Sequence, residues 1–333
     1  GYSGNYTAAG GAWRNVAGAG TVYVKKSTNE YGDLYISNAG KSAAANSTPI
    51  RSVGRHTISG VDEVEEGVWR IEVESNQNDL PWRPVDASLD LGLVGIQVDL
   101  NADEANSPLY IIETNTSNTI TVRTGDDLRG ILGSELLGVH SLNSINVVDG
   151  AKVDFGEDRL EILDVENSQV NSGSSLSIGL VDSTLLSKLL LHGGSINLSE
   201  PLVFNELSLN DVSDAKLFAP SMLIKGNLTM DKSLLRVRFN EVIQVLGSAS
   251  LKESTLGSIL SSSSDEAIYP LKLAVNGLLD IDENSVITGS SAGYSGVNSQ
   301  EGYSWPEFEL SWFDLSYSGC HGGKRRGAID CNY

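Results

Sequence analysis

The sequence predicts an all-β protein, and within that class a right-handed parallel β-helix, or β-solenoid, with an inserted or appended small β-barrel or sandwich module. Residues 145–288 repeat one short pattern, in which alternating apolar positions are broken by small polar turns. The repeats begin mostly at intervals of about 13 to 21 residues, as expected of stacked units that bury too little surface alone. The 35 glycines favour a chain with many tight turns.

Two other architectures fit the repeats less well. Helical arrays need apolar residues at three- and four-residue spacing over ten or more positions, which this stretch does not offer. A β-sandwich would need hairpin turns, and the stretch holds only two suitable pairs, Asp149-Gly150 and Asn276-Gly277. The remaining breaks bend a coil without reversing it. With roughly 20 residues per coil, the stretch predicts about seven coils.

The flanking segments differ from the repeats and from each other. Residues 1–45 are a Gly-rich start with strands, which we interpret as the first coil or coils, or as a cap. Residues 46–125 contain longer, better alternated strands, which predict the small barrel or sandwich module. Residues 291–333 are rich in Gly and aromatic residues and predict a capping tail, because the open ends of a solenoid must be covered.

Within the coil region, residues 126–290, two segments carry a more specific prediction. Residues 126–140 are expected to contain the one short helix of the chain. Residues 189–198 are expected to be one of the repeated lines of strand and small polar turn.

The charge of the chain excludes one class of partner. Lys and Arg number 23 against 43 for Asp and Glu, so the formal net charge is −20 and the pI is about 4.5. Nucleic-acid binding rests on a clustered basic surface and is therefore not expected. No apolar run reaches the length of a membrane span, and residues 1–4 do not resemble a signal peptide. We expect an extracellular or cell-surface protein that is monomeric as a fragment.

Two cysteines, Cys320 and Cys331, lie close together in the Gly-rich tail. An isolated pair in an acidic, β-rich chain is more typical of a disulfide than of a metal site, which would need four ligands. A disulfide in so short a loop would contribute about 3 kcal/mol. The alternative is two unrelated thiols.

One acidic run could hold a cation. Asp99, Asn101 and Asp103 follow a predicted strand in a D-x-N-x-D pattern, whose oxygens suit calcium. An EF-hand loop is excluded, because Glu104 stands where that loop needs Gly and Tyr110 where it needs Glu. The alternative is a solvated acidic turn. No cofactor other than this candidate calcium ion is expected.

Several segments together resemble a known class of protein: residues 18–25 and 31–38, residues 114–122 and residues 277–282. These segments are similar to pieces of very large bacterial secreted or cell-surface proteins built from parallel β-helix segments, with an adhesin-like organisation. The resemblance implies a structural or adhesive role, and it carries over no catalytic residue.

The leading hypothesis is therefore a non-enzymatic segment of a secreted or cell-surface bacterial fibre, in which the β-helix is the scaffold. The contact surface would be the 46–125 module or the aromatic residues of the tail. Its partner would be a polysaccharide, a cell-surface glycan or a neighbouring segment of the same fibre. The aromatic candidates are Tyr303, Trp305, Trp312 and Phe313.

Two alternatives stay open, because one scaffold supports many functions. The first is a polysaccharide lyase or glycosidase, for which Arg236 and Arg238 would share an outward strand face near Asp231 and Glu241. No catalytic residue can be named for it. The second is a glycan-binding module or a viral receptor-binding spike.

Overall fold

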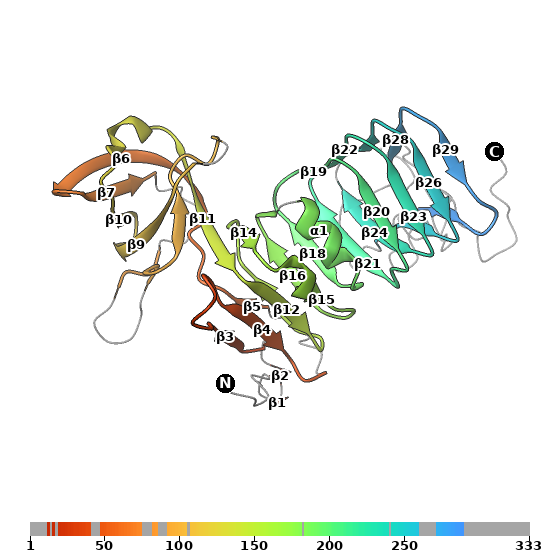
Figure 1. Cartoon of the computed structure of the whole chain (residues 1–333), viewed down its shortest axis with the longest axis horizontal. Helices are drawn as coiled ribbons and strands as arrows, with labels where there is room; N and C mark the ends of the chain where they lie inside the picture. Colours follow the sequence, from red (N-terminus) through yellow and green to blue (C-terminus); the bar gives the residue numbers. More distant parts are fainter. Residues whose placement is uncertain are drawn as a thin grey trace, which may run out of the picture. The chain divides into compact units, whose positions relative to one another are not determined.

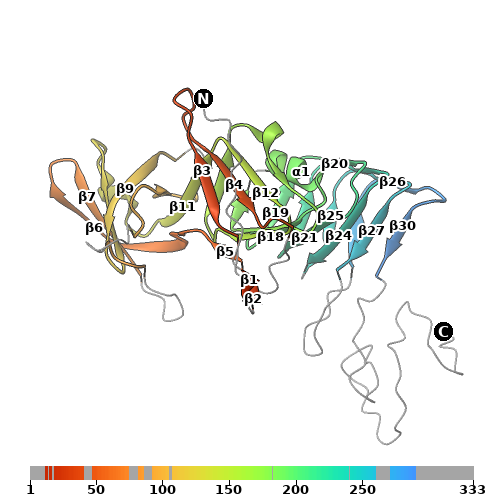
Figure 2. The same cartoon turned by 90° about the horizontal axis from the view of Figure 1, so that it is seen from below.

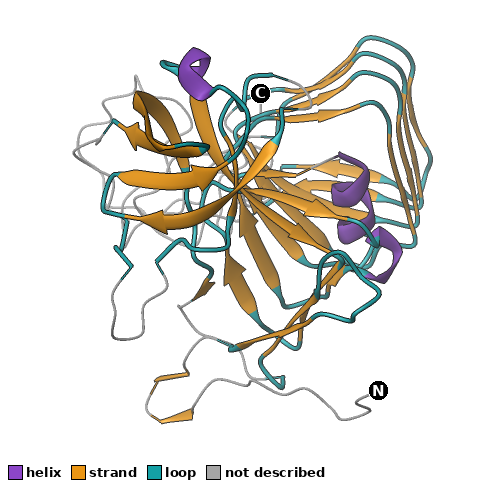
Figure 3. Ribbon diagram, turned by 60° about the vertical axis from the view of Figure 1, so that its left-hand side comes forward, coloured by secondary structure: helices purple, strands orange, loops and turns teal. Residues whose placement is uncertain are grey.

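The computed structural model describes residues 12–13, 15–16, 19–40, 47–74, 82–85, 92–104, 107–181, 183–239, 241–259 and 271–289. Strands dominate these residues, and their stacked parallel coils form a β-solenoid of about six turns, which confirms the predicted fold class. The described helices are α1 (Ser183–Leu190) and the 3-10 helices η1 (Leu128–Ile131) and η2 (Val165–Asn167). Figure 3 shows how few helical residues accompany the strands.

The chain divides into two compact units, one formed by Gly1–Lys188 with Asn197–Ser199 and the other by Leu189–Ile196 with Glu200–Tyr333. In the second unit, three parallel sheets form the sides of the coil (Figures 1 and 2). One sheet contains β21 (Ala215–Ala219), β24 (Leu234–Phe239), β27 (Thr255–Ser258) and β30 (Val286–Thr288). The next contains β19 (Leu202–Phe204), β22 (Met222–Ile224), β25 (Ile243–Val245) and β28 (Leu273–Val275). The third contains β20 (Leu207–Asn210), β23 (Leu228–Asp231), β26 (Ala249–Lys252) and β29 (Leu279–Ile281).

Register between turns places like residues on top of one another. Leu207 pairs with Leu228 and Leu228 with Ala249, and all three side chains are buried. Leu209, Met230 and Leu251 form the neighbouring inward column in the same way. Since alternate residues of a strand face opposite sides, each strand sends its aliphatic residues inward and its polar residues outward. The core of the unit is therefore a set of stacked aliphatic columns.

One corner of three successive turns is built from glycine, at positions 226, 247 and 277. The N–H of Gly247 donates to the carbonyl oxygen of Gly226 at 2.9 Å, and the N–H of Gly277 donates to that of Gly247 at 2.9 Å. A Cβ on Gly247 would lie 2.5 Å from the Gly226 oxygen, which is too close for a non-bonded contact. The corner thus needs glycine because the backbones of successive turns touch there.

In the first unit, the coils also run as parallel stacks. Strand β12 (Ser144–Val148) pairs in parallel with β4 (Asp33–Ser37) and β15 (Gln169–Val170). Strand β13 (Lys152–Asp154) pairs in the same way with β5 (Thr48–Pro49) and β16 (Ser175–Ile178). The third side contains β11 (Glu135–Leu142), β14 (Arg159–Ile162) and β17 (Leu180–Val181). β18 (Ser195–Leu198) follows α1, and β1 (Ala12–Trp13) pairs with β2 (Asn15–Val16) near the N-terminus.

In the first unit, antiparallel strands cover the edges of β4 and β11. Strand β3 (Thr21–Val24) pairs antiparallel with β4. Strand β8 (Gln97–Asp99) pairs antiparallel with β11 on the edge opposite β14, because Val139 pairs with both Gln97 and Arg159. The chain thus covers two otherwise open sheet edges with strands of its own.

The strands between β5 and β11 are antiparallel rather than coiled. They are β6 (Arg55–Glu65), β7 (Val68–Val73), β10 (Thr119–Arg123), β9 (Leu109–Asn115) and β8, in that order across the sheet. A buried cluster that includes Trp69, Trp82 and Leu136 packs against them. That these strands make a separate barrel or sandwich remains a prediction.

Three expectations about detail differ from the structure. Residues 189–198 do not begin with a strand: α1 ends at Leu190, and the strand in this run is Ser195–Leu198. Residues 126–140 do contain a short helix, the 3-10 helix η1, before β11, but it is not the only helix, because η2 and α1 follow it in the chain. The solenoid has about six turns, where the sequence predicted about seven. Among the described residues, no helix has the length and apolar character needed to cross a membrane.

Candidate functional site

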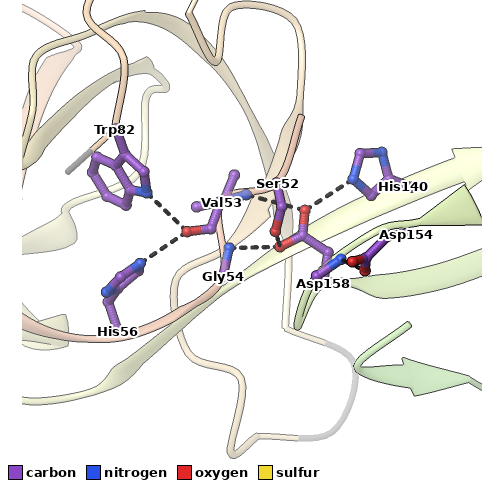
Figure 4. A network of polar contacts seen from close by, with 9 residues as sticks. Ser52, Val53, Gly54, His56, Trp82, His140, Asp154 and Asp158 are labelled. Carbon is purple, nitrogen blue, oxygen red and sulfur yellow. Dashed lines mark hydrogen bonds and ion pairs between the residues drawn. The ribbon is translucent and has the colours of Figure 1, made fainter. Parts of the chain in front are cut away.

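A network of polar contacts surrounds the carboxylate of Asp158 (Figure 4). Asp158 is fully buried at the start of β14. It meets the 52–54 segment that leads into β6, and it meets His140 on β11. Residues more than 100 positions apart in the sequence thus converge on one buried carboxylate.

Four donors occupy the two oxygens of this carboxylate. Oδ1 accepts from the hydroxyl of Ser52 at 2.9 Å and from the backbone N–H of Gly54 at 2.6 Å. Oδ2 accepts from the backbone N–H of Val53 at 3.1 Å and lies 2.9 Å from Nε2 of His140, which must donate to it. A buried charge is tolerated only when it is paired and hydrogen-bonded, and here each oxygen accepts two hydrogen bonds.

Glycines make room for the cluster. Gly138 lies on β11 opposite the carboxylate, and a Cβ at that position would overlap the oxygens of Asp158. Gly54 has a φ of 81°, in the left-handed region that favours glycine. The two glycines therefore give the backbone the conformation and the space that the Asp158 carboxylate requires.

A second layer holds the 52–54 segment from the other side. The carbonyl oxygen of Val53 accepts from the indole N–H of Trp82 at 2.8 Å and from Nε2 of His56 at 2.8 Å. The His56 and Trp82 rings meet edge to face with centroids 5.0 Å apart. Val53 is thus fixed through both its N–H and its carbonyl group.

The hydrogen bonds of this cluster join segments of the fold and do not arrange its side chains for nucleophilic catalysis. A nucleophilic serine needs a base that accepts its proton, with a third group orienting the base. Here the Ser52 hydroxyl donates to Asp158, and the imidazole of His140 donates to the other oxygen of the same carboxylate. The carboxylate stands between the hydroxyl and the ring, so this geometry does not activate Ser52.

A second buried carboxylate, Asp33, joins β4 to the turn before β12. Its Oδ1 accepts from Asn143 Nδ2 at 2.6 Å and from the Ser144 hydroxyl at 2.8 Å, while Lys26 Nζ lies 3.7 Å from Oδ2. Burial works to raise the pKa of Asp33, but these hydrogen bonds and the nearby ammonium outweigh burial and lower it. The carboxylate is therefore held ionised at the junction of two turns.

Of the candidate calcium ligands, Asp99 already has partners within the chain. Asp99 is buried, with Oδ2 3.0 Å from Arg159 Nη1 and Oδ1 accepting from the N–H of Asn101 at 3.0 Å. Asp103 is exposed on the turn that follows. In the described part of the chain, no group of three or more His, Cys, Asp and Glu side chains could hold a metal. The calcium site remains a prediction.

The other predicted site residues lie outside the described residues. These are the Cys320–Cys331 pair and the aromatic candidates Tyr303, Trp305, Trp312 and Phe313.

A cationic cluster lies on the outward face of the β21–β24 sheet. Lys216 pairs in register with Arg236, and Phe218 with Arg238. The alternating burial of both strands turns these four side chains away from the core. Asp214 lies 3.8 Å from Lys216 Nζ and 3.3 Å from Arg236 Nε, so one carboxylate serves two cations.

The Asp158 cluster was missed by sequence reasoning. Ser52 and Asp158 are 106 residues apart and belong to no recurrent spacing. The one available signal was glycine: Gly54, Gly138 and Gly156 flank the residues that meet there. Glycines in otherwise apolar strand patterns often mark close backbone approaches.

Comparison with known proteins adds no family to this description. No protein-family model, curated protein or solved structure matches the chain.

Proposed function

We propose that this chain is a non-enzymatic, structural or adhesive segment of a secreted or cell-surface bacterial fibre. The β-solenoid acts as the scaffold, and the antiparallel strands between β5 and β11 present the contact surface. The partner is a polysaccharide, a cell-surface glycan or a neighbouring segment of the same fibre.

The observation that supports this proposal is that buried carboxylates bond to other parts of the same chain. Asp158, Asp33 and Asp99 each direct their oxygens to hydrogen bonds or ion pairs within the chain. Each joins segments far apart in the sequence. Such groups strengthen a scaffold, whereas catalytic groups face a site where substrate can reach them.

Several apolar residues of the proposed contact surface are exposed. Ile111 on β9 is 59% exposed, and Val64 on β6 and Leu132 after η1 are also exposed. We propose that these side chains belong to one apolar patch, because contiguous apolar patches are typical of interaction surfaces. All three belong to the stretch between β5 and β11.

Adhesion of chain-coated beads to a glycan array and to cultured cells tests this role. We expect Ile111→Asp to lower adhesion at least fivefold while the circular dichroism spectrum stays unchanged. Leu163→Asp is the matched control, because Leu163 is 62% exposed but lies in the coils after β14. Equal adhesion by both variants, or no adhesion by the unmodified chain, would reject the proposed contact surface.

The second candidate function is binding of acidic glycans by the outward cationic cluster. Lys216, Arg236 and Arg238 occupy one sheet face of a strongly acidic chain, with Phe218 among them. Guanidinium groups suit carboxylate recognition, and an aromatic ring offers an apolar surface to a sugar. We expect Arg236→Gln to weaken binding of polygalacturonate in calorimetry, whereas Lys252→Gln on another face leaves it unchanged.

The same polymers separate binding from turnover. The scaffold role predicts no release of reducing or unsaturated sugar from pectin or alginate by the full chain. Sustained release that survives repeated purification would replace the scaffold role with a polysaccharide lyase or glycosidase.

A further inference from the structure

Strand β29, in the last described turn of the solenoid, has an exposed apolar side. Leu279 stacks on Ala249 and Ile281 on Leu251. Ala249 and Leu251 are 0% and 1% exposed, whereas Leu279 and Ile281 are 44% and 40% exposed. The inward side of β29 is therefore an apolar surface of the kind that the preceding turns bury.

The backbone of β29 also has an open edge. Among the described residues, β29 is the last strand of its sheet and pairs with β26 alone. The N–H of Asp282 donates to the carbonyl oxygen of Leu251 on β26. Because alternate residues of a strand bond to opposite sides in a parallel sheet, the N–H groups of Leu279 and Ile281 point to the open edge. Such an edge can pair with a strand of another chain.

Strand β3, in the first unit, presents a second open edge with an apolar side chain. Among the described residues, β3 is the last strand of its sheet and pairs with β4 alone. Tyr23 on β3 pairs with Leu34 on β4, and residues paired across antiparallel strands share a face. Leu34 is 7% exposed and lies in the core, but Tyr23 is 52% exposed. The Tyr23 hydroxyl accepts from the N–H of Gly32 at 2.8 Å, which fixes the ring on this side.

The two edges carry opposite charge. Residues 19–32 contain two lysines and one glutamate, a net charge of +1, and residues 271–289 contain three carboxylates and one lysine, a net charge of −2. Lys25 and Lys26 directly follow β3 and are exposed, and Asp280 on β29 is exposed as well. Two copies of the same edge would bring like charges together, whereas the two different edges attract each other.

We propose that β29 of one copy of the chain docks on β3 of a second copy, head to tail. The contact joins two open strand edges, covers Leu279 and Ile281 with Tyr23, and brings the lysines after β3 toward Asp280. Because it uses two different patches, the contact repeats from copy to copy and forms an open filament instead of a closed dimer. The net charge of −20 opposes association, so the chain stays a monomer in dilute solution.

This inference rests on the fibre role proposed above and names the partner of the chain within the fibre, a second copy. Sedimentation of the full chain over a range of concentrations gives the first test. We expect the average mass to rise steadily with concentration and to pass that of a dimer. Segments linked in one fibre reach effective concentrations of about 1 mM, so a chain that is still monomeric at about 1 mM overturns the proposal. A mass that levels off at the dimer overturns it as well.

Charge variants test which edges meet. Lys25→Glu and Asp280→Lys should each weaken self-association at least about tenfold, because each places like charges at the contact. An equal mixture of the two should associate again, since the unmodified β29 edge of the first fits the unmodified β3 edge of the second. Lys225→Glu, the same charge change at an exposed position between β22 and β23, is the control and should associate like the unmodified chain. Normal association of either Lys25→Glu or Asp280→Lys alone would overturn the head-to-tail contact.

An apolar variant and hydrogen exchange test the surface on β29. Ile281→Asp should weaken association at least about tenfold, because it buries a charge in the contact. Val203→Asp is the matched control, since Val203 is an exposed apolar residue on the outer face of β19. The amides of Leu279 and Ile281 should become protected from exchange only at concentrations where filaments form. Full protection in dilute solution would show that the chain covers this edge itself and would overturn the proposal.

These measurements separate the filament from the proposed adhesive surface. They follow mass and amide protection in the absence of glycans and cells, whereas the Ile111→Asp experiment follows adhesion. Filaments without adhesion would leave the head-to-tail contact standing and reject the adhesive surface, and adhesion by a chain that never forms filaments would do the reverse.

Discussion

The backbone N–H of Ser233 donates to the hydroxyl of Ser254, one turn further along the solenoid, at 3.0 Å. The same contact recurs between Val212 and Ser233 at 3.2 Å and between Ser254 and Ser285 at 3.0 Å. Ser233 and Ser254 also donate to carbonyl oxygens two residues earlier. A buried seam of hydroxyl groups thus joins successive turns at one corner.

Removing one hydroxyl from this seam should destabilise the solenoid. In Ser233→Ala, the buried N–H of Val212 loses its acceptor, which costs about 1–3 kcal/mol of the free energy of unfolding. Urea denaturation monitored by circular dichroism measures the loss. Ser208→Ala is the control, because Ser208 is exposed on the outer face of β20, and it should change stability by less than about 0.5 kcal/mol. Equal losses of stability in the two variants would show that the seam of hydroxyl groups does not stabilise the solenoid.

The glycine corner should tolerate substitution even less. In Gly247→Ala, the new Cβ would lie 2.5 Å from the Gly226 carbonyl oxygen, so adjacent turns must separate. We expect a loss of at least about 2 kcal/mol, comparable with overpacking of a core. Gly257→Ala is the matched control in the same unit, because its Cβ would meet Thr288 at an ordinary contact distance of 3.4 Å. A Gly247→Ala protein as stable as this control would show that the corner can relax.

The coil architecture was predictable because its cause is local and repeated. Leu207 and Leu228 show the same alternation of apolar and polar residues in each turn, and that alternation decides which side chains enter the core. The helix at Ser183–Leu190 was missed because its leucines continue into 191 without a break, and a short apolar run does not separate helix from strand. The glycine pair at 193–194, which follows the helix, was the sign that such a run had ended.

The Asp158 cluster was not predictable, because its parts meet only after folding. Ser52 precedes the antiparallel strands, and Asp158 follows two further strands of the coil. Nothing in the spacing of Ser52, His140 and Asp158 distinguishes them from other polar residues of the chain. A carboxylate that closes a long insertion is visible only in three dimensions.

Asp158 should be among the most sensitive positions of the first unit. Asp158→Asn keeps the shape but turns an amide NH₂ toward N–H donors and removes the charge that faces His140. Breaking a buried, charge-assisted cluster of this kind costs about 3–5 kcal/mol. Asp103→Asn, the same substitution at an exposed position, is the control. If the midpoint of thermal or urea unfolding shifts equally little in both variants, the cluster is not needed for stability.

Acid should weaken the junction at Asp33 in a defined direction. Burial raises the pKa of this carboxyl, but hydrogen bonds from Asn143 and Ser144, together with Lys26, lower it further than burial raises it. The folded pKa therefore lies below the ordinary value of 3.8. A group whose pKa falls on folding contributes stability that is fully present above its unfolded pKa and is lost as the pH falls through the folded pKa.

The Asp33→Asn variant isolates this contribution. It should be less stable than the unmodified chain at pH 7, because Asn143 and Ser144 lose a charged acceptor. Between about pH 5 and pH 2 its free energy of unfolding should fall less steeply, because one ionisation that differs between the folded and unfolded states has been removed. Urea unfolding across that pH range measures both effects, with Asp103→Asn as the control for loss of a carboxylate. A pH dependence as steep in Asp33→Asn as in the unmodified chain would mean that the acid sensitivity comes from other carboxylates.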